Sequence, residues 1–130
     1  MRFSVSGDRI TVSTGLREYI QRRLYFALGR FGPAIDRATV RVGDMNGPRG
    51  GIDKCCQIVV TLRASGSPPI AIGDIDEDLR SAVARASNRA GRAVARAVER
   101  RRRKRAYQRR RLPGERVPRA VYLDSQDDLG

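Results

Sequence analysis

Two stretches of the chain alternate apolar and polar residues, and they constrain the fold more than any other feature. In residues 38–42 and again in residues 56–64, every second residue is apolar. A period of two is typical of a strand that buries one face. The sequence Asn-Gly-Pro-Arg-Gly-Gly at positions 46–51 lies between them and is typical of a flexible turn. Together they predict a long β-hairpin whose apolar side comprises Ala38, Val40, Val42, Cys56, Ile58, Val60, Leu62 and Ala64.

The segment before the hairpin predicts one strand and one helix. Residues 2–13 alternate in the same way around a Gly-Asp turn, so the predicted strand continues to Val12. Residues 14–31 place apolar side chains at three- and four-residue steps until a Gly-Pro pair follows them. This spacing predicts a helix with one buried face, and either Ser13 or Thr14 can cap its start.

The segment after the hairpin predicts a short strand and a long second helix. Ile-Ala-Ile at positions 70–72 is interpreted as an edge strand, and the acids at 74–78 suit the N-terminus of a helix. The helix is predicted to run from about Glu77 to beyond Arg100. Small residues, which allow a helix to lie close to a sheet, dominate its apolar stripe of Leu79, Ala82, Val83, Ala86, Ala90, Ala93, Val94 and Ala97.

This order of elements predicts an α+β fold. It is β-α-β-β-β-α, with a four-stranded antiparallel sheet and two helices packed on one face. The domain is predicted to span residues 1–104. Beyond it the helical pattern decays and two prolines follow, so residues 105–130 are predicted to form a flexible basic tail with an acidic end at Asp124, Asp127 and Asp128.

The charge of the chain points to a polyanionic partner. Lys and Arg number 27 against 14 Asp and Glu, a formal net charge of +13. A compact chain with this charge repels itself unless an anionic molecule shares its surface. No apolar run approaches the roughly 20 residues that span a bilayer. The N-terminus also lacks the apolar core of a signal peptide, so a cytoplasmic protein without a membrane partner is expected.

The residues offer little for catalysis or metal binding. The chain has no His, and its two cysteines, Cys55 and Cys56, are adjacent. Adjacent thiols make a strained disulfide and cannot complete a zinc site alone, so they are interpreted as filling a strand in a reducing compartment. The acids at 74–78 lack the glycine and the final glutamate of a calcium loop. No enzyme activity, cofactor, metal or small-molecule substrate is expected.

The second helix carries a row of arginines. At about 100° per residue, Arg89, Arg92, Arg96 and Arg103 fall within about 40° of Arg85. Like charges at this spacing destabilise an isolated helix, a cost that is expected where phosphates neutralise them. The candidate RNA-binding residues are therefore Arg85, Arg89, Arg92, Arg96, Arg100 and Arg103, to which we add Arg23 and Arg41.

The kind of nucleic acid follows from what the predicted fold lacks. It has no pair of helices like those of DNA-binding folds, and its Phe and Tyr residues are too scattered to stack single-stranded bases. A rigid ridge of arginines suits a structured RNA that is recognised by its shape and its phosphates.

Residues 5–24, the alternating hairpin and residues 76–105 are each similar to parts of known proteins. Together they resemble the family of ribosome hibernation promoting factors, also called ribosome-associated inhibitors or sigma-54 modulation proteins. The similarity covers roughly residues 2–105. The entry into the first helix matches at Ile10, Val12, Leu16, Arg17, Tyr19 and Ile20. The start of the second helix matches at Asp78, Leu79, Ala82 and Val83, but Arg80 and Ala84 stand where the family usually has Tyr and Asp.

The resemblance implies a bacterial ribosome-binding protein. Such a domain sits on the small ribosomal subunit, against its rRNA in the channel for messenger and transfer RNA, and holds the ribosome idle under stress or in stationary phase. The family's basic helix positions coincide with Arg89, Arg92, Arg96 and Arg100. The chain resembles a short form, which either assists another ribosome-pairing factor or prevents pairing.

Two other functions stay open at this point. One is a DNA-binding or transcription-modulating protein, and the other is a general polyanion or membrane-surface binder that acts through its tail.

Overall fold

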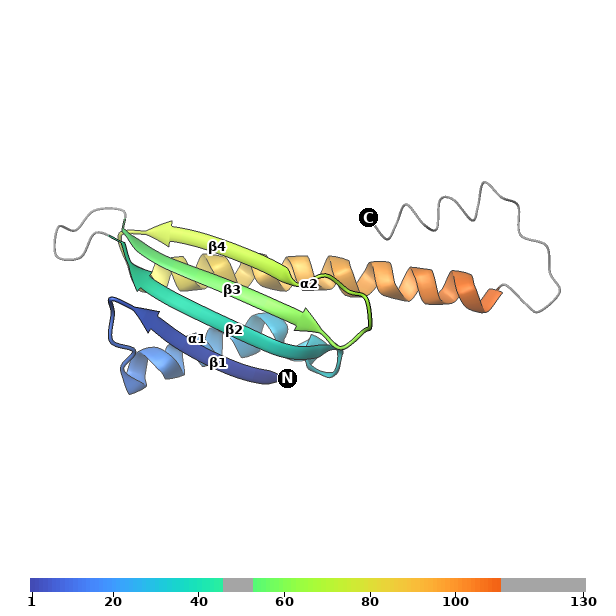
Figure 1. Cartoon of the computed structure of the whole chain (residues 1–130), viewed down its shortest axis with the longest axis horizontal. Coiled ribbons are helices and arrows are strands. Elements are labelled where there is room, and N and C mark those ends of the chain that lie inside the picture. Colours follow the sequence, from blue (N-terminus) through green and yellow to red (C-terminus); the bar gives the residue numbers. More distant parts are fainter. Residues whose placement is uncertain (46–52, 111–130) are drawn as a thin grey trace. The chain divides into compact units, whose positions relative to one another are not determined.

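The structure is a computed structural model that describes residues 1–45 and 53–110, with the side chain of Arg110 left out. Contacts divide the chain into one compact unit, Met1–Val94, and a second that begins at Ala95. Figure 1 shows the elements in chain order: β1 (Arg2–Asp8), α1 (Thr14–Leu28), the 3₁₀ helix η1 (Gly29–Ala34), β2 (Ile35–Asp44), β3 (Lys54–Leu62), β4 (Ile70–Asp76) and α2 (Leu79–Arg110).

The four strands form one sheet in the order β1-β2-β3-β4. The predicted hairpin is confirmed, because β2 and β3 pair antiparallel with Val40 opposite Ile58. The α+β class and the order of elements are confirmed as well. The sheet is mixed, however, because β1 and β2 are parallel, with Val5 opposite Val40. Helix α1 connects the two strands and returns the chain to the end of the sheet where β1 began, so that β2 runs in the same direction as β1. The prediction of an antiparallel sheet was therefore wrong for this pair.

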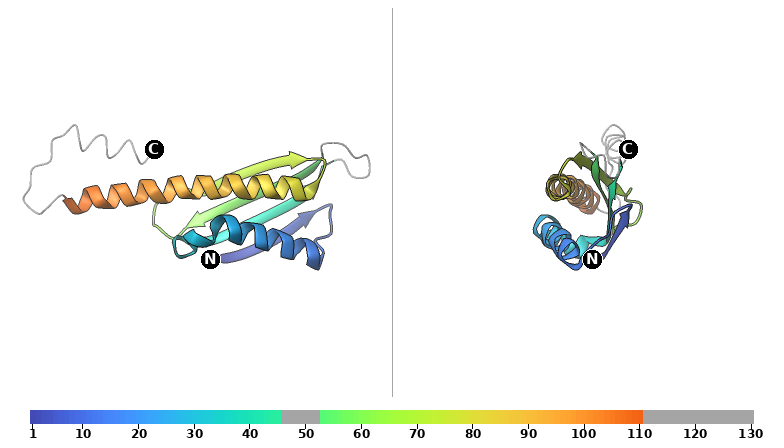
Figure 2. Two further views of the ribbon diagram at one scale, coloured as in Figure 1. Left: turned by 180° about the vertical axis from the view of Figure 1, so that it is seen from behind. Right: turned by 90° about the vertical axis from the view of Figure 1, so that its left-hand side faces the viewer.

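The core lies between the sheet and its two helices. Figure 2 shows α1 and the part of α2 up to Val94 on the same face of the sheet. The alternating side chains of β2 and β3 point into this layer, whereas Arg37 and Arg41 are exposed on the other face. The fully buried side chains of the core include Ile20, Leu24, Leu28, Ile35, Val40, Val42, Ile58, Val60, Val83 and Val94.

Small residues bring α2 close to α1. A Cβ atom added at Gly91 would lie 2.9 Å from the backbone oxygen of Ala27 and 3.3 Å from its Cβ. Ala82, Ala86 and Ala90 are completely buried on the same helix. A larger side chain at position 91 would push the two helices apart.

The first strand is shorter than predicted. It ends at Asp8, so Ile10 and Val12 lie outside the sheet. Arg9 adopts a left-handed conformation with φ of 60°. The chain turns so tightly here that a Cβ atom on Gly7 would lie 2.4 Å from the backbone oxygen of Ile10. The alternation of residues 2–13 therefore comes from two segments that a turn separates.

The last strand and the last helix are longer than predicted. Strand β4 continues through Asp74 to Asp76, so these two acids lie in the sheet and not at the start of a helix. Helix α2 continues to Arg110, six residues into the segment that was predicted to be a tail. Residues 105–110 contain neither Gly nor Pro, so nothing in their composition stops the helix. The predicted turn at 46–51 and residues 111–130 lie outside the described residues.

We expect Gly91→Val to destabilise the protein, because the new side chain must displace the backbone of Ala27. Overpacking of this kind costs about 1–3 kcal/mol of unfolding free energy. Gly15→Val is the matched control, since a Cβ atom at Gly15 meets nothing within 4 Å. Urea unfolding of both variants checks this, and equal stability of the two would contradict the close packing.

Candidate nucleic-acid interface

Arg85 and Arg89 point from α2 toward the edge strand β4. The Nε atom of Arg85 lies 3.2 Å from Oδ2 of Asp74, and its Nη2 atom lies 2.6 Å from Oδ2 of Asp76. Nη2 of Arg85 also donates to the backbone oxygen of Ile75 at 3.1 Å. Nη1 of Arg89 donates to the backbone oxygen of Gly73 at 2.7 Å and lies 3.7 Å from Asp74. The first two arginines of the predicted row are therefore bound by the protein itself.

These contacts change how the charges behave. The hydrogen bonds that Arg85 donates to Asp74 and Asp76 raise the pKa of Arg85 above its ordinary value. The pKa of Asp76 is lowered, first by the hydrogen bond from the backbone N–H of Asp78 and then by the one from Arg85. Both groups stay ionised across the physiological range. A phosphate that approaches Arg85 must therefore compete with two carboxylates that already occupy its guanidinium.

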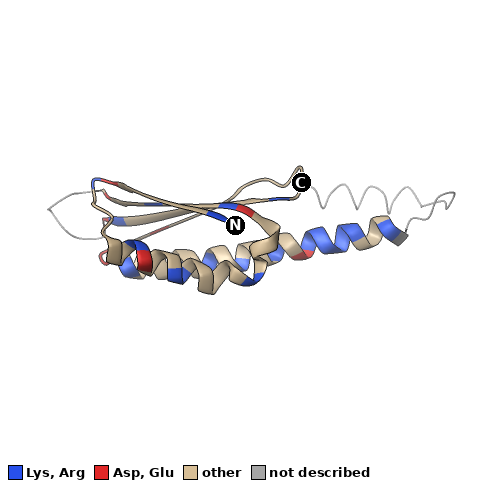
Figure 3. Ribbon diagram, turned by 90° about the horizontal axis from the view of Figure 1, so that it is seen from below, with Lys and Arg blue, Asp and Glu red and all other residues tan. Residues whose placement is uncertain are grey.

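The later arginines of the row are not held in this way. Arg92 is exposed in the first unit, and it makes no hydrogen bond or ion pair with any described residue. In the second unit, Arg96, Arg100 and Arg103 line one open hollow on α2 together with Ala95 and Glu99. Figure 3 shows how Lys and Arg follow one another along this part of α2. Within this row, the guanidinium groups without a partner among the described residues are those of Arg92, Arg96, Arg100 and Arg103.

The two other candidate arginines lie apart from this row. Arg23 on α1 is half-buried, and its Nη2 atom donates to Oδ1 of Asn88 on α2 at 3.4 Å. Arg41 on β2 is exposed on the face of the sheet that the helices leave open. The structure thus brings Arg23 next to α2 but places Arg41 on the opposite side of the sheet.

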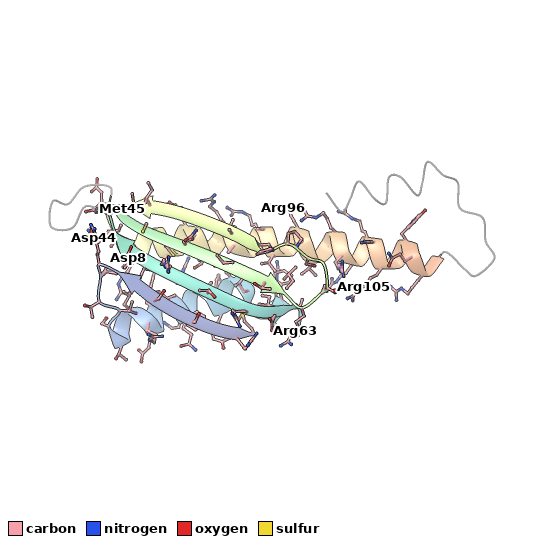
Figure 4. All side chains as sticks on the ribbon, in the orientation of Figure 1. Asp8, Asp44, Met45, Arg63, Arg96 and Arg105 are labelled. Atoms are coloured by element: carbon pink, nitrogen blue, oxygen red, sulfur yellow. The ribbon has the colours of Figure 1, made fainter. Side chains whose placement is uncertain are left out.

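Acidic side chains gather at one end of the sheet. Figure 4 labels Asp8 and Asp44 at this end and Arg63 at the other. Lys54 lies among the acids, with its Nζ atom 3.2 Å from Asp44 and 2.9 Å from the buried Asp53. The hydrogen bond from Lys54 to Asp53 is the main reason why the pKa of Lys54 is raised. These acids make this end of the sheet a less favourable place for an anion than the exposed arginines of α2.

The sequence predicted that the acids at 74–78 lie at the N-terminus of α2, but only part of this cluster caps the helix. The carboxylate of Asp78 accepts a hydrogen bond from the backbone N–H of Ser81 at 3.3 Å and from its hydroxyl at 2.9 Å. Asp74 and Asp76 bind arginine instead. Within residues 1–45 and 53–110, no three His, Cys, Asp or Glu side chains gather so that they could hold a metal ion.

Arg80, which stands where the family usually has tyrosine, ties α1 to α2. Its guanidinium lies over the ring of Tyr19 at 4.6 Å from the ring centre. The hydroxyl of Tyr19 donates to the backbone oxygen of Arg80 at 3.1 Å. A cation on an aromatic ring and a hydrogen bond therefore join the starts of the two helices.

The two cysteines are free thiols in strand β3. Cys56 is buried in the core, and burial is the main reason why its pKa is raised to about 12. A thiol with such a pKa is protonated and unreactive at neutral pH. The prediction that Cys56 fills a strand is confirmed.

Two exposed aromatic residues on α1 were not among the residues predicted from the sequence to bind a partner. Tyr25 and Phe26 on α1 are 50% and 84% exposed. The aromatic residues are thus not all scattered through the fold, because these two lie side by side on a solvent-facing helix surface. The helical spacing could have predicted this exposure, because Phe26 lies about 200° around the helix from the buried Leu24.

The chain was compared with known families, proteins and structures. The model of the family described as sigma 54 modulation protein / S30EA ribosomal protein matches residues 3–102. No curated protein sequence matches the chain. The N-terminal domain of Protein Y from Thermus thermophilus has a TM-score of 0.59 at 21% identity, and the match covers 74% of this chain and 98% of that one. A ribosomal subunit interface protein from Coxiella burnetii has a TM-score of 0.61 at 16% identity, over 74% and 96% of the two chains.

No helix in the described parts of the chain is long and apolar enough to cross a membrane.

We expect the double variant Asp74→Asn/Asp76→Asn to bind a structured RNA hairpin more tightly than the wild type does. Without the two carboxylates, Arg85 and Arg89 keep only their bonds to the backbone oxygens of Ile75 and Gly73, so their other N–H groups can bind phosphate. Each new phosphate contact steepens the slope of log affinity against log salt by about 0.7–0.9, which a salt titration measures.

The control is Asp8→Asn/Glu77→Gln, which changes the net charge equally at exposed acids that make no ion pair with the described residues. Equal salt slopes for the two double variants would show that Arg85 and Arg89 do not gain phosphate contacts.

Proposed function

Because the chain belongs to the sigma-54 modulation protein / S30EA ribosomal protein family, we propose that it blocks translation by occupying the small ribosomal subunit. The family makes it a ribosome-associated modulation factor. Our proposal adds the place and the mechanism. The domain binds the rRNA in the channel for messenger and transfer RNA, under stress or in stationary phase in the bacterial cytoplasm, and excludes transfer RNA by its volume.

The observation that carries this proposal is the set of unpaired arginines on α2. Arg92, Arg96, Arg100 and Arg103 make no ion pair with the described residues, although acids neutralise Arg85 one turn or more before them. Guanidinium groups bind phosphate oxygens with two parallel hydrogen bonds. A helix that leaves several of them free therefore suits the phosphate backbone of a folded RNA.

A rigid domain suits occlusion. The sheet and two helices bury a continuous apolar layer, so the first unit has a fixed volume that a narrow RNA channel cannot share with another ligand. The solved structure from Coxiella burnetii is named as a ribosomal subunit interface protein. That name supports a ribosomal partner for this chain as well.

We expect Arg92→Glu/Arg96→Glu to abolish specific binding to small ribosomal subunits and to restore transfer RNA binding to them. Both side chains are exposed, so the fold and its melting temperature should change little. Co-sedimentation with purified subunits measures binding, and retention of labelled transfer RNA on filters measures occlusion. Duplex DNA and anionic vesicles at the same salt concentration serve as competing partners.

The matched control is Arg37→Glu/Arg63→Glu. It makes the same charge change at two exposed arginines outside the candidate interface. It should weaken binding much less than Arg92→Glu/Arg96→Glu does, because it lowers the net charge equally but leaves the α2 row intact. If both double variants lose the subunit equally, net charge and not the α2 row determines binding. Preference of the wild type for duplex DNA would favour the transcriptional alternative.

A further inference from the structure

The outer surface of α1 carries an aromatic pair that the fold does not use. Ile20, Leu24 and Leu28 of this helix are completely or almost completely buried against the rest of the domain. Phe26 is 84% exposed and Tyr25 is 50% exposed on the solvent side. A phenylalanine this exposed gains little from folding, and together with Tyr25 it leaves an aromatic surface available to a partner.

The surroundings of this pair are polar. Tyr25 and Phe26 line an open hollow on α1 together with Glu18, Gln21 and Arg22. Arg22 precedes Phe26 by one helical turn, so its guanidinium is on the same face as the ring. None of the described residues that line the hollow is aliphatic. It offers two flat rings, a guanidinium, an amide and a carboxylate, which is a combination that suits a flat ligand with polar edges.

The geometry points to an unpaired RNA base as the occupant. We infer that one base stacks on Phe26, that Gln21 or Glu18 accepts a hydrogen bond from its edge, and that Arg22 contacts the ring or the adjoining phosphate. Exposed aromatic and arginine side chains are the usual stacking partners of unpaired bases. This inference rests on the proposed function, because it assumes that RNA is the partner.

Size and charge favour a base over a protein. A stable protein interface uses roughly 20–30 residues on each side, whereas five described residues line this hollow and only two of them, the aromatic pair, are hydrophobic. The chain also carries a net charge of +13, which draws RNA toward it. An apolar side chain of a ribosomal protein remains the competing occupant that the experiment must separate.

The first test compares aromatic and aliphatic replacements in binding to purified small ribosomal subunits. Phe26→Leu keeps an apolar side chain but removes the stacking surface, and we expect it to weaken affinity about tenfold. Phe26→Tyr keeps the surface and should stay within about twofold of the wild type. Ile75→Leu, at a residue of β4 that is 47% exposed, is the control and should have no effect. Wild-type affinity of Phe26→Leu would overturn base stacking and favour an apolar protein contact.

The second test uses single-stranded RNA beside the small ribosomal subunit. The chain contains no tryptophan, so Phe26→Trp introduces a single tryptophan, which can be excited at wavelengths that the four tyrosines do not absorb. Stacking on a base should quench its emission with small subunits and with single-stranded poly(A), whereas Ile75→Trp should stay unquenched. Quenching by poly(A) without any binding to subunits would contradict the proposed function but would still support a base-binding site at Phe26. Absence of quenching by both RNAs would overturn the base site.

Discussion

The close approach of α2 to α1 is the contact on which the interface depends. Gly91 lies against the backbone of Ala27, and buried alanines line the same side of α2. Because that side is committed to packing, the arginines at three- and four-residue steps must face outward or toward β4. The small residues therefore determine both the thickness of the helical layer and the direction of the positive charges.

The edge strand β4 pairs with some of the outward arginines of α2 and leaves others unpaired. Asp74 and Asp76 are near enough to bind Arg85, and the backbone of Gly73 binds Arg89, whereas Arg92 has no such partner among the described residues. In a chain with a net charge of +13, this internal pairing lowers the self-repulsion of the folded domain. It also means that Arg85, unlike Arg92, can bind an anion only in competition with a carboxylate.

Much of the fold follows from periodicity. The alternation around Val40 and Ile58 predicted the central hairpin, and the spacing of Ile20 and Leu24 predicted the first helix. Strand direction was harder, because period two says which face is buried but not which way the neighbour runs. That direction came from the helix that joins β1 to β2.

The site was less predictable from the sequence than the fold was. The arginine row was visible in the spacing, but its internal neutralisation was not. Asp74 and Asp76 were interpreted as helix-capping residues, and only their pairing across space with Arg85 shows another role. The exposure of Phe26 was not predicted for a related reason, because a count of aromatic residues does not show which face of a helix they occupy. In both cases the missing information was the position of one element against another.

Competition between the protein and transfer RNA on purified small subunits tests the central claim most directly. Subunits that carry messenger RNA and labelled transfer RNA are titrated with the protein, and both ligands are quantified on the same particles. Mutual exclusion is the predicted result, with each particle holding either the protein or transfer RNA. Particles that hold both ligands at saturation would contradict occlusion of the channel.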